Sequence, residues 1–172
     1  MTLPDTMKAM VTMGHGDLDQ MELHHAWPRP NPAEGEVLIR VGACGLNNTD
    51  VNTRSGWYSK TVTEATTGGA FDDVGGEDPT WGAAPISFPR IQGADVCGEI
   101  VAVGAGVDPS RIGERVITDG WLWDADEPDN KNKAGYFGSE RDGGFAEFTT
   151  TLSRNALAVT STLSDAELAT FS

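Results

Sequence analysis

The side chains of this sequence that could bind a transition metal are few and scattered. Among its 3 histidines and 2 cysteines, His15 stands alone, His24 and His25 are adjacent, and neither Cys44 nor Cys97 has a second cysteine nearby. A zinc site needs three or four such ligands that converge on one point. The spacing of these residues is therefore a weak zinc signal.

Two other ligand motifs are incomplete. Residues 104–109 (GAGVDP) begin like the dinucleotide-binding pattern Gly-x-Gly-x-x-Gly, but Pro109 stands where the third glycine should be, so we interpret them as a turn. Residues 124–129 (DADEPD) faintly resemble a calcium loop, yet Pro128 occupies a ligand position and the required glycine is missing. We interpret this run as a solvated acidic loop.

A cluster of polar residues begins at Asn47. Asn47 and Thr49 are residue types that favour the start of a helix, where their side chains accept hydrogen bonds from backbone N–H groups. Asp50 and Arg54 are four residues apart, so we expect them to pair on one helical face. Cys97 lies in an apolar run and is interpreted as a small buried residue, not as a reactive thiol.

Short strands are expected to position these residues. Residues 36–41 (EVLIRV) alternate apolar and polar side chains, as a half-buried strand does. The prolines of residues 27–32 (WPRPNP) favour an extended connection, because proline continues neither a central strand nor a helix. Further strands are expected at residues 8–12, 100–103, 115–118 and 145–151. Short strands separated by glycines predict a mainly β fold, either a barrel or a sandwich.

Two stretches lack this periodicity and are predicted to be long surface loops. Residues 61–87 are rich in Thr, Gly and Asp, and residues 119–144 carry many acidic side chains. Irregular loops of this length are uncommon and are often functional.

The last residues carry the signature of a helix start. Ser164 and Glu167 fit a capping box, in which the first side chain caps the helix and the second reaches back to the first residue. Because the sequence stops at Ser172, we expect a chain that is cut short, with a natural C-terminal helix stub as the alternative.

The composition excludes several classes of protein. With 172 residues, 12 Lys+Arg and 26 Asp+Glu, the formal net charge is −14, so we expect no nucleic-acid partner and no docking on anionic membranes. The sequence has no apolar run of about 20 residues, and we expect no signal peptide at its start. We expect a cytoplasmic protein with reduced thiols.

Five ordered motifs resemble the medium-chain dehydrogenase/reductase superfamily, which includes zinc-type alcohol dehydrogenases and quinone oxidoreductases. The similarity extends from about Met7 to the end of the sequence. The motifs are residues 30–41 (PNP, then GEVLIRV), 42–58 (GACGLNNTD, then RSGWY), 93–104 (GADVCGEIVAVG), 113–116 (GERV) and 143–148 (GGFAEF).

The resemblance implies an enzyme of two parts: a GroES-like, partly open β-barrel with a few short helices that carries substrate groups, and a Rossmann domain that binds NAD(P)H. It places an N-terminal extension at residues 1–6, the GroES-like domain at 7–163, and the start of a helix toward an absent Rossmann domain at 164–172. The cofactor-binding residues would lie on that absent domain, and the full-length enzyme would be a homo-oligomer acting on a small-molecule substrate. By itself the chain would be inactive.

The resemblance also suggests a zinc-independent branch. Zinc-dependent members take one ligand from a Cys in Gly-x-Cys-x-Ser/Thr-Asp and another from a His in Gly-His-Glu; here Asn47 and Ala94 stand at those positions, with Asp95 in place of the Glu. The cysteines of the structural zinc lobe are absent, and Cys44 lies three residues too early to substitute. We therefore expect no metal site.

In the zinc-free branch, the resemblance makes Asn47, Thr49 and Tyr58 the candidate catalytic residues. Asn47 would offer its amide to a substrate carbonyl, Thr49 matches a proton-relaying hydroxyl, and Tyr58 would be a donor or wall of the same cleft. The expected reaction is hydride transfer to an activated C=C, a quinone or a carbonyl, and residues 61–87 are hypothesised to form a rim that selects the substrate. The alternatives are a zinc-dependent alcohol dehydrogenase domain and a stand-alone GroES-like interaction module.

Overall fold

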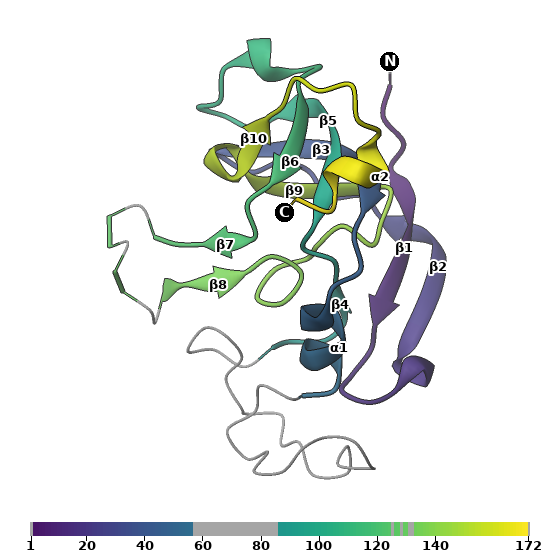
Figure 1. The fold of residues 1–172 in the computed structure, drawn as a ribbon. Helices are drawn as coiled ribbons and strands as arrows, with labels where there is room; N and C mark the ends of the chain where they lie inside the picture. The colour runs from purple at the N-terminus through teal and green to yellow at the C-terminus, as the bar shows by residue number, and fades with distance from the viewer. Residues whose placement is uncertain (1, 57–85, 125, 128, 131–132, 172) are drawn as a thin grey trace.

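Strands dominate the computed structural model, which describes residues 2–56, 86–124, 126–127, 129–130 and 133–171 (Figure 1). A five-stranded antiparallel sheet has the order β10-β6-β5-β3-β9, and a three-stranded sheet has the order β2-β1-β4. The larger sheet comprises β3 (Glu36–Cys44), β5 (Val96–Val103), β6 (Arg115–Thr118), β9 (Phe148–Leu152) and β10 (Ala156–Ala158). The smaller comprises β1 (Thr6–Thr12), β2 (Met21–Pro28) and β4 (Arg90–Ile91), while β7 (Trp121–Leu122) pairs with β8 (Gly135–Tyr136). The larger sheet curls into a partly open barrel, which confirms the mainly β fold expected from the sequence.

The middle of strand β3 is buried on both faces. Val37 and Ile39 belong to one apolar cluster, whereas Leu38 belongs to a second cluster that includes β1 residues, and all three side chains are fully buried. Successive side chains of a strand point to opposite faces, so β3 lies between the two clusters. The half-buried strand predicted for residues 36–41 is correct at Arg40, which is exposed, but wrong at Leu38, which β1 covers.

Two further expectations need correction. Trp27 and Pro28 form the end of β2, an edge strand, where the missing N–H of proline is tolerated. Residues 119–144 are more than a surface loop, since they contain β7, β8 and Phe137, which is buried in the core. Most of the other predicted loop, residues 61–87, lies outside the described residues. Cys97 is fully buried, as predicted.

The helices within the described residues are short. They are α1 (Asn48–Arg54) and α2 (Asp165–Leu168), together with the 3-10 turns η1 (Leu18–Gln20), η3 (Pro109–Arg111) and η5 (Ser153–Asn155). No helix in the described part of the chain is long and apolar enough to cross a membrane. The turn predicted at residues 104–109 is present, with Gly106 at φ +81°.

Helix α2 begins with the predicted capping box. The Ser164 hydroxyl accepts a hydrogen bond from the Glu167 N–H at 3.3 Å, and the Glu167 carboxylate accepts one from the Ser164 N–H at 2.8 Å. The two bonds satisfy N–H groups that a helix start otherwise leaves unpaired.

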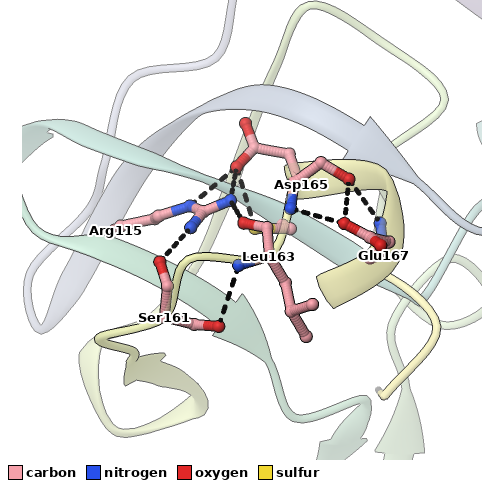
Figure 2. A network of polar contacts seen from close by, with 7 residues as sticks. Arg115, Ser161, Leu163, Asp165 and Glu167 are labelled. Carbon is pink, nitrogen blue, oxygen red and sulfur yellow. Dashed lines mark hydrogen bonds and ion pairs between the residues drawn. The ribbon is translucent and has the colours of Figure 1, made fainter.

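The guanidinium of Arg115, on β6, forms hydrogen bonds that connect α2 and the residues before it to the barrel (Figure 2). Its Nε donates to Asp165 Oδ1 at 2.7 Å, and its two Nη groups donate to the carbonyl oxygens of Ser161 (3.1 Å) and Leu163 (2.8 Å). Cys97 Sγ donates to the same Asp165 oxygen at 3.5 Å. Burial and the neighbouring Asp165 carboxylate raise the pKa of Cys97 to about 11, so the thiol keeps its proton and remains a donor. We refer to these contacts as the Arg115 clamp.

We expect R115A to loosen α2 without unfolding the barrel. The variant removes every guanidinium contact to residues 161–165, so the amides of Leu168 and Ala169, bonded to Ser164 O and Asp165 O, should lose protection from hydrogen exchange. R115K should restore only part of the protection, because an ammonium cannot reproduce the planar fork. The control is R40A, which breaks an exposed Arg40–Glu99 pair. Equal exchange in R115A and R40A would contradict the prediction.

Candidate functional site

Asn47 lies between the end of β3 and α1, at the N-cap position of that helix. Its backbone is extended (φ −125°, ψ 157°), and its side-chain Oδ1 accepts a hydrogen bond from Thr49 N–H at 3.3 Å. The Asp50 carboxylate accepts one from Asn47 N–H at 2.9 Å, which completes a capping box. The capping role that the sequence suggested for Asn47 is therefore confirmed.

Asp50 ties the start of α1 to the segment before β5. Its Oδ1 accepts a hydrogen bond from Gly93 N–H at 3.1 Å, and its backbone carbonyl accepts one from Gln92 Nε2 at 2.9 Å. Gln92 is buried and in turn accepts a bond from the Thr12 hydroxyl of β1 at 2.9 Å. Three segments far apart in sequence thus fix the helix that carries Asn47 and Thr49.

The predicted pairing of Asp50 with Arg54 is wrong. Asp50 bonds backward to the helix start, as an acidic residue in the third helical position does in a capping box. Arg54 points elsewhere, donating to the carbonyl oxygen of Gly16 at 2.6 Å and lying 3.7 Å from the Asp17 carboxylate.

The Asn47 amide also contacts Asp95, the residue before β5. Asn47 Nδ2 donates to Asp95 Oδ2 at 3.0 Å. Asp95 is only 7% exposed, and its backbone carbonyl accepts a bond from Gly45 N–H at 2.8 Å. The fold thus joins two positions that are 48 residues apart in sequence. Sequence reasoning placed Asp95 beside the second zinc-ligand position but assigned it no role.

The site is acidic and partly shielded from solvent. Burial, opposed by the backbone hydrogen bonds from Asn47 and Gly93 and supported by the nearby Asp95 charge, raises the pKa of Asp50 to about 6. Burial, together with Asp50 and Asp95, also raises the pKa of Cys44 far above its ordinary value. The Cys44 thiol therefore remains protonated, whereas a metal ligand would have to be a thiolate.

We expect ionisation of Asp50 to lower the stability of the folded chain. Because its folded pKa lies above the ordinary aspartate value of 3.8, the native state holds this proton more tightly than the unfolded state between about pH 4 and pH 6. The stabilising contribution of Asp50 to the free energy of unfolding is therefore fully present below about pH 4 and is lost as the pH rises through 6. Solvent screening limits the loss to on the order of 1 kcal/mol.

Carboxyl-carbon NMR of Asp50 should give a midpoint near pH 6. The free energy of unfolding, measured in urea, should change less between pH 4 and pH 6 in D50N than in the unmodified chain. A titration midpoint at the ordinary aspartate value, with the same pH dependence of the free energy of unfolding in both proteins, would show that burial does not shift the pKa of Asp50.

Thr49 has a hydroxyl that is not used within the described fold. Its Oγ1 is shielded from solvent and has no hydrogen-bond partner among the described residues. Tyr58, the third candidate residue, lies outside those residues. The structure thus places Asn47 and Thr49 at the same helix start, while the third expected member of the site is not described.

An open apolar groove borders this region. Leu46, which directly precedes Asn47, is 86% exposed and lines the groove together with Val41 and Phe145. The groove has a volume of about 520 Å³ and is otherwise formed mainly by β1 and β2 side chains. The groove therefore extends to the residue that precedes Asn47, whereas Asn47 itself does not line it.

The side chains at the two expected zinc positions, Asn47 and Ala94, supply neither a thiolate nor an imidazole. Asn47 uses its amide for the helix cap and for Asp95, and Ala94 is a buried core residue with no ligand atom in its side chain. Across the part of the chain that is described, no three His, Cys, Asp or Glu side chains are grouped so as to hold a metal ion. The histidines do not converge: His15 contacts Arg54 O at 3.2 Å, and His24 lies 3.2 Å from Glu22.

Comparison with known proteins gives a consistent result. Residues 33–161 match the family profile described as "Alcohol dehydrogenase GroES-like domain". The chain is 28% identical over 168 residues to alcohol dehydrogenase notN from Aspergillus sp. (91% of this chain, 40% of the relative). It is 31% identical over 112 residues to the quinone oxidoreductase of Lama guanicoe (65% and 27%). It is 26% identical over 121 residues to an NAD-dependent alcohol dehydrogenase of Sulfolobus acidocaldarius (69% and 28%).

Solved structures agree with the fold. A candidate alcohol dehydrogenase from Sinorhizobium meliloti 1021 superimposes with a TM-score of 0.81 at 44% identity, over 98% of this chain and 44% of that one. A cobalt- and zinc-bound thermostable alcohol dehydrogenase from Pyrobaculum aerophilum gives 0.69 at 25% identity, over 95% and 43%. The chain thus spans less than half the length of each relative named here, and some structural neighbours bind metal.

Proposed function

Because the chain belongs to the alcohol dehydrogenase GroES-like domain family, we propose that it is the substrate-binding part of an NAD(P)(H)-dependent oxidoreductase that works without zinc. The relatives named above include alcohol dehydrogenases and a quinone oxidoreductase, and we propose a small-molecule substrate for this chain as well. The proposed reaction is hydride transfer to an activated C=C, a quinone or a carbonyl. The observation that carries the proposal is the Asn47 amide, a neutral donor held by Asp95 at the position of a zinc ligand.

The chain's own residues would bind and polarise the substrate. When bound, a nicotinamide supplies the hydride, and negative charge then develops on the substrate oxygen. The Asn47 amide would donate a hydrogen bond to that oxygen, and a donor held in place before the reaction stabilises such charge. The Thr49 hydroxyl, which has no partner among the described residues, would hold or pass the proton that completes the reduction.

The cofactor would be bound by a Rossmann domain outside residues 1–172, joined through the helix that begins at Ser164. Two features support this: the chain covers only 40% of notN, and the Arg115 clamp holds the last residues firmly on the barrel. We propose that residues 7–163 form the GroES-like domain and that the chain alone does not turn over NAD(P)H.

Metal analysis of the complete enzyme tests the zinc-independent reaction. We expect no stoichiometric zinc, and unchanged kcat for NAD(P)H-dependent reduction of a quinone or enone after dialysis against a chelator. A relative that binds zinc, assayed in parallel with an alcohol, should lose activity on the same treatment. One tightly bound zinc per chain, whose removal abolishes turnover, would instead identify a zinc-dependent alcohol dehydrogenase.

A further inference from the structure

We propose that Asp95 is a positioning residue that fixes the orientation of the Asn47 amide, so that the site presents an N–H donor and takes ligands through an acceptor oxygen. The inference rests on the proposed function for its substrate class, namely a quinone, ketone, aldehyde or enone oxygen. The orientation itself rests only on contacts within this chain.

Both ends of the Asn47 amide are held. Oδ1 faces the N–H of Thr49, and Nδ2 faces the carboxylate of Asp95. A flipped amide would place its oxygen against a carboxylate and its NH₂ group against a backbone N–H, which are two repulsive contacts. The hydrogen-bond network therefore allows one orientation, with nitrogen toward Asp95.

This orientation leaves one donor free. An Asn NH₂ group has two hydrogens, and Asp95 accepts one of them. Within the described residues the second Nδ2 hydrogen has no acceptor, and Asn47 is an exposed residue. A carboxylate that accepts the first hydrogen polarises the amide and strengthens the second hydrogen as a donor.

Hydrogen bonds hold the backbone at Asp95 and on both sides of it. Its carbonyl is bonded to Gly45 N–H, and the residues on either side of it are bonded to Thr118. The Thr118 hydroxyl donates to Ala94 O at 2.7 Å and accepts from Val96 N–H at 3.1 Å. Leaving a carboxylate that is 7% exposed without a donor would be costly, so Asp95 and Asn47 hold each other in place.

The orientation is tested on the 172-residue chain by NMR of the Asn47 side-chain NH₂ group, assigned with N47S. In the unmodified chain we expect two well-separated proton shifts, one of them downfield because its acceptor is charged. D95N keeps an acceptor oxygen without the charge, so the downfield shift should fall by about half, since charged hydrogen bonds are roughly twice as strong. D95A should remove the separation. The control is E99Q, which changes an exposed carboxylate on β5, the strand that follows Asp95.

Circular dichroism shows which variants fold. If D95A does not fold, D95N alone is used to test the inference. Asn47 proton shifts that are the same in D95N as in the unmodified chain would overturn the inference and leave the proposed function intact.

Activity of the complete enzyme tests the substrate half of the inference. D95A should lower kcat for a quinone or enone roughly tenfold, with a smaller change in KM, because a misplaced donor acts mainly on the transition state. If the NMR signature responds to Asp95 but N47S leaves turnover unchanged, the proposed function fails while the orientation stands.

Discussion

Replacing Asn47 by serine is expected to lower kcat for NAD(P)H-dependent reduction of a quinone or enone roughly 100-fold in the complete enzyme, because removal of one preorganised donor to a developing oxyanion costs that much. Serine caps helices as well as asparagine does, so α1 should survive. Its hydroxyl is too short to reach both the Asp95 carboxylate and a substrate oxygen. The measurement is steady-state kinetics alongside thermal unfolding.

Two companion variants separate catalysis from folding. N47A removes the cap as well, and should add a stability loss of about 1 kcal/mol to the same loss of turnover. N48A changes the neighbouring exposed asparagine, for which the structure shows no capping role, and should leave kcat unchanged. Equal turnover in N47S and N48A would rule out Asn47 as the donor.

Replacing Gly93 by alanine is expected to lower the free energy of unfolding by about 3 kcal/mol or more. Gly93 has φ +95°, a conformation that strains any other residue. A Cβ there would also lie 2.5 Å from a Phe145 ring carbon and 2.7 Å from Cys44 Sγ. The N–H of this residue is a hydrogen-bond donor to Asp50, so displacement would also disturb α1. Urea unfolding of the chain measures the loss.

Gly113 provides a matched control for this effect. It has nearly the same backbone conformation, φ +94°, but nothing lies within 4 Å of the position that a Cβ would take there. G113A should therefore cost only the conformational strain, about 1–2 kcal/mol. The difference between the two variants isolates the close approach of Cys44 and Phe145 to the backbone. Equal losses would mean that this packing relaxes without cost.

Local patterns made part of the structure predictable. The capping box at Ser164 and the capping role of Asn47 depend on hydrogen bonds between residues at most three apart. The expected strand at residues 115–118 is β6, because alternation within a strand reflects its own two faces. Predictions about side-chain partners were weaker. The helix expected to carry Asp50 and Arg54 is present, but the Asp50 carboxylate accepts a hydrogen bond from the N–H of Asn47 at the helix start and does not pair with Arg54.

The burial of β3 shows why tertiary context overrides such patterns. Its alternation in sequence indicated one solvated face, yet Leu38 on that face is covered by β1 and Ile91. The sequence of residues 36–41 does not indicate that a second sheet packs on the face that carries Leu38. Likewise, Phe137 lies in a stretch with little periodicity and is nevertheless part of the core.

The sequence by itself determined the mainly β fold, the two helix starts and the absence of Cys or His at the expected zinc positions, because each is a property of residue type and short spacing. Only the tertiary structure decided the contact between Asn47 and Asp95. Antiparallel pairing of β3 with β5 sets Cys44 opposite Val96, which brings the residues just beyond each strand end together. Hydrogen bonds between such residues depend on strand register, and register is fixed by packing of the whole sheet.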